Sequence, residues 1–374
     1  MIKVPLLRPH FDSEELKEIQ SVLESGWVSQ GPKAKLFEER VAEYLGIKQA
    51  VAVTNCTCAL HLSLQCLGIS KDDEVLVADY TFPATAHAVL YCGAKPVFVD
   101  VNPRTYNLDP EKIEEKIGER TRAIIPVHTF GQPAEMDRII KLAQEHGLKV
   151  IEDAACALGA KYQGRYAGTI GDLGCFSFHA RKGITTGEGG MIATDDEAYA
   201  KKARYLSTFG MTAAWDREKS DKLIIPEFND MGYNYKMSDI TAAVGVAQMK
   251  KLDSIIERKR ELAKYWDEKL DDIRLVEPPH LAKGALHVYQ SYVAVVDKSI
   301  NRNKLIEIMM EKGIQTQIGT YSCHIQPVYR SKDSCPCSRE IFETAIALPM
   351  YYTLKENEID LAAEALKHSV DELR

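Results

Sequence analysis

The chain has 374 residues, of which 45% are hydrophobic and 27% are charged. It is long enough to bury a large core and to hold roughly two or three domains. A net charge of -7 and a pI near 5.9 give no general attraction to nucleic acid or to an anionic membrane. No apolar stretch has the length needed to cross a bilayer, and the first residues lack the apolar core of a signal peptide. The composition therefore predicts a cytoplasmic protein without nucleic-acid or membrane partners.

Short β-branched runs alternate with amphipathic segments from residue 50 to about 194. This alternation is typical of a mainly parallel sheet covered by helices on both faces, an α/β fold. The runs predict seven strands, at 51–53, 74–77, 96–99, 123–127, 148–151, 175–178 and 191–194.

The spacing of apolar residues changes after residue 194. Apolar residues recur from Ile240 to Trp266 with few breakers, which predicts one long helix or a helix pair. A smaller C-terminal α+β domain is expected to follow. We therefore divide the chain into a large domain, 1–250, and a small domain, 251–374. The elements expected in the small domain are a strand at 287–296, a helix at 302–311, a loop at 331–338 and a final helix from 355.

The nine cysteines favour reduced thiols over a disulfide framework, because their number is odd and several lie inside apolar runs. Cys335 and Cys337, with Cys323 and His324 a dozen residues earlier, raise the alternative of a zinc site. Their spacing matches no common zinc module, so we predict free thiols in a loop and no metal.

Polar residues at the ends of the predicted strands are the candidates for chemistry, because open α/β sheets bind their ligands there. Thr57 opens a helix after the first strand, where free N–H groups suit a phosphate, although such a residue is more often only an N-cap. Asp153 ends an apolar strand and could face a pyridine nitrogen or cap the next helix. From this motif alone, the two interpretations are about equally favoured.

A strand also delivers Ser177 and then Lys182 into a turn rich in Gly and Thr. A lone lysine is normally a solvated surface residue. A partly desolvated lysine has a lowered pKa, however, and becomes nucleophilic enough to form an imine. The segment 232–239, polar and aromatic, precedes the long helix, and its simplest interpretation is a helix start with Ser238 as N-cap.

The run 174–192, together with 26–33, 151–155 and 232–238, resembles the DegT/DnrJ type of nucleotide-sugar aminotransferases. These enzymes belong to fold type I of the pyridoxal-phosphate (PLP) dependent enzymes, the aspartate aminotransferase superfamily. The resemblance extends from Val4 to Leu366. It implies a three-layer fold with a mainly parallel seven-stranded sheet, a smaller C-terminal α+β domain, and PLP as cofactor.

The resemblance also implies roles for individual residues. Lys182 matches the lysine that binds PLP covalently and later moves a proton. Asp153 matches the carboxylate paired with the pyridine nitrogen, with Glu152 the next candidate. Phe82 matches the aromatic residue that stacks on the cofactor ring. The phosphate ligands match Thr57 and Ser177, helped by the backbone around Cys56.

One further match implies a homodimer with shared active sites. Asn234 corresponds to a residue that reaches the phosphate held by the neighbouring subunit. Two positions depart from the family's pattern. Cys56 stands where Gly is usual, so the turn must accommodate a Cβ. Cys156 stands where Gln or His is common, near the cofactor's phenolic oxygen, which puts the tuning of the cofactor in doubt.

The implied reaction moves an amino group, with glutamate as the expected donor, to a nucleotide-linked keto-sugar, above all a 4-keto-6-deoxyhexose. By analogy of position, Trp27, Tyr321 and His324 line the sugar pocket. Basic side chains could bind a pyrophosphate through charge-assisted hydrogen bonds, although basic residues are more often only surface charges. The candidates are Lys33, Arg181 and Arg330.

Other activities share this fold. A branch of relatives acts on free keto-inositols, and the segment 176–182 looks more like the nucleotide-sugar branch. Relatives that remove a sugar hydroxyl carry His in place of Lys182, which argues against that reaction. A cysteine desulfurase would use a mobile cysteine, for which Cys323 or the loop with Cys335 and Cys337 is a candidate. A sensor that keeps PLP without turnover is disfavoured by the intact lysine and Asp153.

Overall fold

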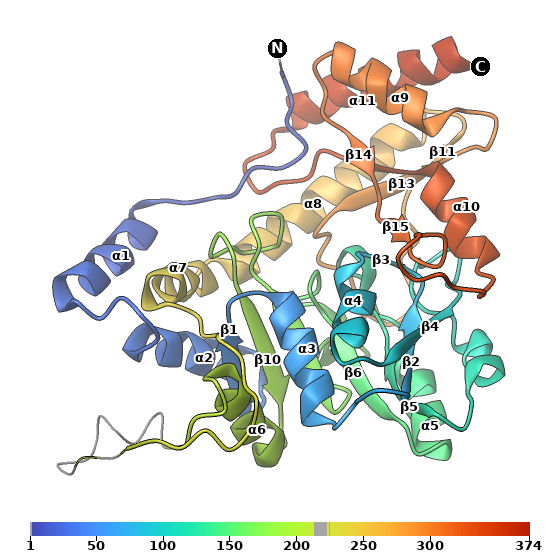
Figure 1. The fold of residues 1–374 in the computed structure, drawn as a ribbon. Coiled ribbons are helices and arrows are strands. Elements are labelled where there is room, and N and C mark those ends of the chain that lie inside the picture. Colours follow the sequence, from blue (N-terminus) through green and yellow to red (C-terminus); the bar gives the residue numbers. More distant parts are fainter. Residues whose placement is uncertain (1, 213–222, 224) are drawn as a thin grey trace.

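The computed structural model describes residues 2–212, 223 and 225–374. Its central element is a seven-stranded sheet with the strand order β1-β10-β9-β6-β5-β2-β4 (Figure 1). Each strand overlaps one of the seven predicted runs. The strands are β1 Gln49–Val53, β2 Glu74–Ala78, β4 Lys95–Val99, β5 Thr121–Ile125, β6 Lys149–Asp153, β9 Leu173–Ser177 and β10 Gly190–Thr194.

The pairing within this sheet is mainly parallel, as predicted. Strands β9, β6, β5, β2 and β4 run parallel to their neighbours, whereas β10 is antiparallel to both β9 and β1. Parallel strands share the edge at which their carboxyl ends meet, so Asp79, Asp153 and Ser177 come to the same side of the sheet.

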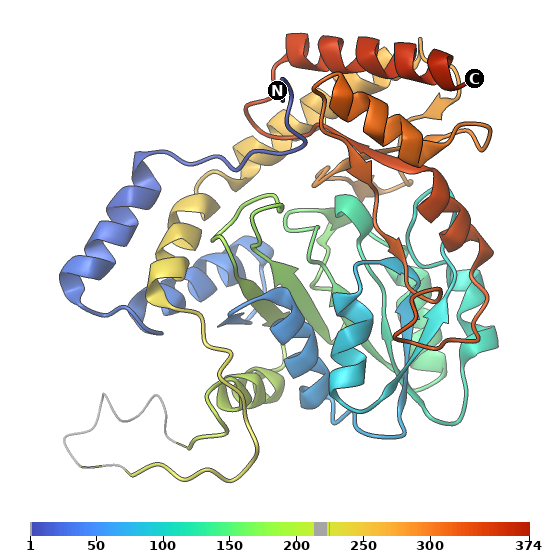
Figure 2. The ribbon, with the colours of Figure 1, turned by 45° about the horizontal axis from the view of Figure 1, so that its top comes forward.

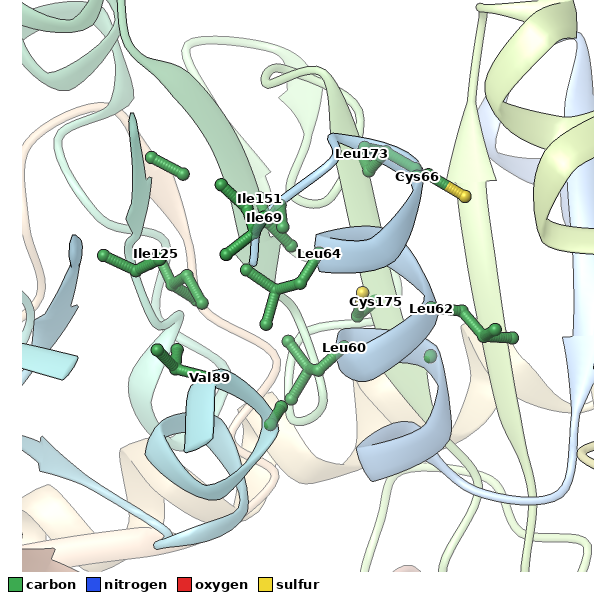
Figure 3. Close-up of a cluster of buried hydrophobic side chains, with 14 of the residues drawn as sticks. Leu60, Leu62, Leu64, Cys66, Ile69, Val89, Ile125, Ile151, Leu173 and Cys175 are labelled. Atoms are coloured by element: carbon green, nitrogen blue, oxygen red, sulfur yellow. The ribbon is translucent and has the colours of Figure 1, made fainter. Parts of the chain in front are cut away.

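Helices cover both faces of the sheet and give three layers. One face packs against α3, α4 and α6, and Figure 3 shows the side chains of α3 meeting those of β5, β6 and β9. The other face packs against α2, α5 and α7. Alternate residues of each strand pack against the two helix layers, because successive side chains of a strand point to opposite faces. The helices are α1 Ser13–Ser25, α2 Pro32–Leu45, α3 Cys56–Cys66, α4 Ala84–Tyr91, α5 Met136–Glu145, α6 Glu197–Ser207 and α7 Asp239–Met249.

The C-terminal third forms a second, smaller unit, drawn in orange and red (Figure 2). Its sheet has the strand order β11-β13-β16-β14 and packs against α8, α9 and α11 around the buried Trp266. Val4 also lies in this cluster, so the N-terminus runs along the small unit. The division at residue 250 stays a prediction. The elements are α8 Leu252–Leu270, β11 Val276–Glu277, β13 Tyr292–Val296, α9 Arg302–Glu311, β14 Gln317–Ile318, β16 Ala345–Leu348 and α11 Glu356–Leu373.

Several predicted bounds differ from the structure. Of the two predicted forms, one long helix or a helix pair, the structure has the pair, α7 and α8. The strand predicted from residue 287 begins at Tyr292. The loop predicted at 331–338 already contains the start of a helix, α10 Pro336–Thr344, with proline in its first turn. Short pairings were missed because two-residue strands carry no periodic signal. They are β3 Tyr80–Thr81 with β15 Tyr321–Ser322, and β7 Lys161–Tyr162 with β8 Arg165–Tyr166 and β12 Ala285–Leu286. In the part of the chain that the structure describes, no helix is long and apolar enough to span a membrane.

Candidate active site

Two adjacent carboxylates end β6, and they have different surroundings. Asp153 is 5% exposed, and its carboxylate accepts hydrogen bonds from the Thr85 hydroxyl at 2.7 Å and the Ala155 N–H at 3.1 Å. This carboxylate lies close enough to Lys182 to act on its charge. Asp153 is therefore a buried, oriented acceptor beside the lysine.

Glu152 points to the other face of the sheet and is fully buried. Its carboxylate accepts a hydrogen bond from His128 Nε2 at 2.8 Å and others from the N–H groups of Gly168, Ile170 and Gly171. His128 Nδ1 accepts from a backbone N–H, so Nε2 carries the proton. Burial opposes the charge of Glu152, but these donors outweigh it and lower its pKa. Glu152 thus has a structural environment and is not available to a ligand on the Asp153 side.

The turn that carries Lys182 is a tight loop between β9 and β10. It is closed by backbone hydrogen bonds from Phe178 to Gly189 and from Ala180 to Gly187. Lys182 Nζ donates to Cys156 Sγ at 3.1 Å. Burial disfavours the charged amine, yet Cys156, Cys56 and Asp153 outweigh it and raise the pKa of Lys182. The predicted lowering of this pKa was therefore wrong for the free amine, because sequence reasoning counted burial and missed the thiols.

The start of α3 forms a cradle beside this turn. Asn55 caps the helix by accepting a hydrogen bond from the Cys58 N–H at 2.9 Å, which leaves the N–H groups of Cys56 and Thr57 directed at the helix N-terminus. Gly190 permits this close approach, since a Cβ there would lie 2.3 Å from the backbone of Asn55. Cys56 is the first helical residue and has no positive φ, so its Cβ causes no backbone strain. Ser177, the last residue of β9, completes the predicted phosphate ligands.

Phe82 is 64% exposed, which is unusual for a large aromatic residue at the end of a buried strand. Its ring lies edge-on to that of Tyr321, with centroids 6.1 Å apart. The two are brought together because β15 pairs with β3, with Tyr321 opposite Thr81. An exposed ring near Thr85, whose hydroxyl binds Asp153, is suited to stacking on a planar cofactor.

A buried network joins this region to the small unit. Asp79, at the end of β2, accepts hydrogen bonds from Ser322 Oγ at 2.8 Å, His324 Nδ1 at 2.7 Å and Ser338 Oγ at 2.5 Å. The atoms of Asp79, His324 and Cys335 also lie within metal-binding distance of one another. Their hydrogen bonds account for this arrangement without an ion. His324 therefore faces Asp79 through Nδ1.

The remaining predicted substrate and dimer residues are held in other ways. Lys33 Nζ forms an ion pair with Glu18 at 2.6 Å, so it is not a free cation for a pyrophosphate. Trp27 Nε1 donates to the carbonyl of Gln30 at 3.1 Å. Asn234 Oδ1 accepts a hydrogen bond from Lys236 Nζ. None of the hydrogen bonds described for these three residues connects them to the Lys182 turn within this chain.

Lys259 on α8 is a residue that sequence reasoning missed. It is 5% exposed, and its Nζ donates to the carbonyl of Gln290 at 3.1 Å. It lines two small cavities that Lys182 also lines, one of them shared with Cys156. The sequence hides it, because it stands between Arg258 and Arg260 in a charged helix. Only the heptad-like spacing with Ile255 and Leu262 could have placed it on the buried face.

The family model of DegT/DnrJ/EryC1/StrS aminotransferases matches residues 9–367. The chain belongs to this family. It is 37% identical to the GDP-perosamine synthase of Caulobacter vibrioides over 97% of each chain. Its fold is similar to that of Spr1654 from Streptococcus pneumoniae in a PLP form, with a TM-score of 0.92 and 26% identity over 99% of each chain. It is also similar to DesI in the presence of its TDP-sugar product, with a TM-score of 0.88 and 32% identity over 96% of this chain and 91% of that one.

The predicted family, fold type I and cofactor are thereby confirmed, and the protein is a PLP-dependent sugar aminotransferase. The described residues fit PLP. Lys182 offers a half-buried amine and Asp153 a buried carboxylate, while the start of α3 offers free N–H groups and Phe82 an exposed ring. These groups belong to separate segments that meet at one edge of the sheet.

Proposed function

We propose that the enzyme transfers an amino group from glutamate to a nucleotide-linked keto-sugar, with a 4-keto-6-deoxyhexose as the preferred acceptor. The observation that carries the acceptor class is the family membership together with relatives whose names specify GDP-linked and TDP-linked sugars. Tyr321 and His324 support this acceptor. Tyr321 lies beside Phe82, and His324 is hydrogen-bonded to Asp79.

Each candidate residue has its own role in the proposed reaction. PLP, when bound, serves as the electron sink that lets an amino group pass between two substrates. Lys182 holds the cofactor and moves a proton at the substrate carbon through Nζ. Asp153 keeps the pyridine nitrogen protonated, since a buried carboxylate stabilises the adjacent positive charge. Thr57, Ser177 and the N–H of Cys56 hold the phosphate.

Cys156 belongs to the same site through its contact with Lys182 Nζ. A thiol is a weaker hydrogen-bond donor than the Gln or His expected there. With Cys156, the phenolic oxygen of the cofactor would therefore have a weaker hydrogen-bond donor. We expect the colour of the bound cofactor to change with pH over a different range in Cys156→Gln.

The active unit in this proposal is a cytoplasmic homodimer with shared sites. Apolar side chains gather on the surface of α1 and of the segment before α7: Leu16 is 70% exposed, Leu23 60%, Phe228 64% and Met231 82%. Exposed apolar groups of this size favour an interface. Asn234 lies in the same segment, which suits a contact with the site of a second subunit.

Mixed dimers test the sharing of sites. A Lys182→Ala chain combined with an Asn234→Ala chain leaves one site with both residues intact, so activity should return on mixing. Heterodimers shown by mass spectrometry to form, but without activity, would contradict the sharing.

A cysteine desulfurase is disfavoured by the state of its candidate cysteines. Cys323 and Cys335 are buried, with 0% and 1% exposure, and burial raises the pKa of both thiols. A mobile nucleophile needs an accessible thiolate. Cys337 is half-buried, and the pKa of its thiol is also raised by burial. Keto-inositols remain the alternative acceptor.

A substrate screen tests the proposed acceptor. The PLP-loaded enzyme is incubated with glutamate and a panel of nucleotide-linked 3-keto and 4-keto sugars, with keto-inositols as the comparison. Amination of a nucleotide-linked 4-keto sugar is expected, measured by mass spectrometry. Turnover of keto-inositols alone would reject the proposed acceptor.

A further inference from the structure

The segment between β3 and α4 carries two side chains into opposite environments. Phe82 is 64% exposed, whereas Thr85, in the first turn of α4, is 1% exposed. The Thr85 N–H donates to the Phe82 carbonyl at 3.2 Å, so one tight turn joins the two residues. The candidate stacking ring and a buried hydroxyl are therefore delivered by the same short segment.

The Thr85 hydroxyl has three polar neighbours and one proton to donate. Its Oγ1 lies 2.7 Å from Asp153 Oδ2, 3.0 Å from Thr81 Oγ1 and 3.2 Å from the Phe82 carbonyl oxygen. The contact with Asp153 has the length of a charge-assisted hydrogen bond, and the contact with the carbonyl is longer than most O–H···O bonds. The proton of Thr85 is therefore assigned to the bond with Asp153.

The direction of the second hydrogen bond follows from the first. An ionised carboxylate can only accept, so Thr85 donates to Asp153 and its oxygen is left to accept from the Thr81 hydroxyl. Both threonines are buried, Thr81 with 3% and Thr85 with 1% exposure. Successive bonds of this kind polarise one another, and hydrogen bonds to the ionised form of an acid favour that form. The two hydroxyls thus offset the cost of burying the Asp153 charge.

Asp153 is held at both carboxylate oxygens by different segments of the chain. Its Oδ2 accepts from Thr85 of α4, and its Oδ1 accepts from the Ala155 N–H at 3.1 Å. Two donors on different oxygens restrict the rotation of the carboxylate, which has about four lone-pair directions in all. The unused directions are those available to a ring nitrogen in the proposed function.

We propose that Thr85 is a positioning residue for the amino transfer, which keeps Asp153 ionised and oriented toward the pyridine nitrogen of PLP. Thr81 directs the proton of Thr85 to the carboxylate. This inference rests on the proposed function, in which Asp153 keeps the pyridine nitrogen protonated. Without the Thr85 hydroxyl, the carboxylate loses a donor that favours its charged form, and the proton between nitrogen and carboxylate moves toward Asp153.

A purely structural role for Thr85 makes a different prediction. Threonine hydroxyls in helices commonly bond back to a carbonyl three or four residues earlier, and Thr85 lies 3.2 Å from such a carbonyl, that of Phe82. In that case, removal of the hydroxyl lowers stability and leaves the protonation of the cofactor unchanged. The protonation state of the ring nitrogen therefore separates the two roles.

NMR of the enzyme loaded with PLP that carries nitrogen-15 in its ring measures this state, because the shift of a pyridine nitrogen changes strongly on protonation. Thr85→Val removes the hydroxyl at nearly constant shape, Thr85→Ala removes it without a methyl group against Asp153, and Thr85→Ser restores it. Thr344→Val is the matched control, since Thr344 is a buried threonine of α10 whose hydroxyl donates to the Glu340 carbonyl at 2.8 Å. Stopped-flow absorbance gives the rate of the half-reaction with glutamate for each protein.

We expect a protonated ring nitrogen in the wild type, in Thr85→Ser and in Thr344→Val. Its signal should move toward that of unprotonated pyridine in Thr85→Val and Thr85→Ala. The half-reaction should slow about tenfold to a hundredfold in these two variants, the worth of a hydrogen bond to a charged group. Thermal melting shows which variants are folded. An unchanged nitrogen signal or an unchanged rate in a folded Thr85→Val or Thr85→Ala protein overturns the proposal, as does a Thr85→Ser protein that behaves like Thr85→Ala.

The same measurement distinguishes a failure of this proposal from a failure of the proposed function. The nitrogen signal is recorded without substrate, so it does not depend on glutamate as the donor. If Asp153→Asn loses the protonated nitrogen and Thr85→Val keeps it, the role of Asp153 stands and that of Thr85 falls. If the nitrogen of the wild type is unprotonated, or is unaffected by Asp153→Asn, both roles fall.

Discussion

Two regions contribute to the candidate active site in different ways. One is the carboxyl edge of the large sheet, and the other is the seam, the contact between the large sheet and the small unit around Asp79, His324 and Lys259. At the sheet edge, Asp153 and Lys182 lie in short motifs, and each is held by residues close to it in the fold. At the seam, Asp79, His324 and Lys259 depend on partners from distant parts of the chain. The comparison indicates that the candidate cofactor residues were visible in short sequence motifs, whereas the contacts between the two units depend on how those units pack.

The largest effect is expected from Lys182→Ala, which removes the covalent link to PLP and the proton carrier. A positioned acid-base group contributes about a hundredfold to ten-thousandfold in rate, so kcat should fall by at least that factor. PLP should still bind noncovalently, because the cradle at α3 is intact. Steady-state kinetics and cofactor content measure the two effects, with Lys201→Ala, at an exposed lysine of α6, as the control. Near-normal turnover in Lys182→Ala would reject the assignment.

The second effect separates the two carboxylates of β6. Asp153→Asn should slow the half-reaction with glutamate by about two to three orders of magnitude, because the amide cannot stabilise the pyridinium charge. Glu152→Gln should leave that rate near the wild type but destabilise the fold by about 1–3 kcal/mol, because His128 and buried backbone N–H groups lose part of their charged acceptor. Stopped-flow absorbance and urea unfolding measure these effects. The reverse pattern would exchange the roles of the two residues.

Glu152 also predicts a pH dependence of stability. Its folded pKa is lowered by His128 and backbone N–H groups against the effect of burial. A carboxyl group whose pKa is lowered on folding adds to the free energy of unfolding at pH values above its ordinary pKa. This contribution is lost as the pH falls through the folded pKa. The wild type should therefore lose more stability between pH 5 and lower pH than Glu152→Gln does. Equal losses in urea unfolding at these pH values would contradict an ionised Glu152 in the folded protein.

A smaller effect is expected at the seam. Asp79→Asn leaves buried donors of Ser322, His324 and Ser338 without their acceptor, at a cost of about 1–3 kcal/mol. The KM for the sugar should rise more than kcat falls, because Tyr321 and His324 lose their support. Asp100→Asn is the matched control, since Asp100 accepts from backbone N–H groups of α10 and has no bond to His324 in the described chain. An equal KM in both variants would remove Asp79 from substrate positioning.

The sequence was sufficient for the sheet, because β-branched runs are a local pattern. The cofactor residues were assigned from short motifs and the family resemblance, and their roles stay predictions. Seven β-branched runs mark the strands, and Lys182 stands in a turn whose glycines are visible in the sequence. The seam was not predictable in the same way. Nothing local pairs β3 with β15 or places Asp79 beside His324, and Lys259 is hidden among charged neighbours. The thiols around Lys182 reversed its predicted pKa shift, because Cys56 and Cys156 come from other segments.

The central claim is that Lys182 is the residue that carries PLP, and reductive labelling tests it most directly. The enzyme is loaded with PLP, reduced with borohydride and digested with trypsin. The label is then mapped by mass spectrometry. We predict a label on the peptide that contains Lys182, and no covalent label in Lys182→Ala. A label on Lys259, a buried lysine that lines the same cavities as Lys182, or on Lys236 would contradict this assignment.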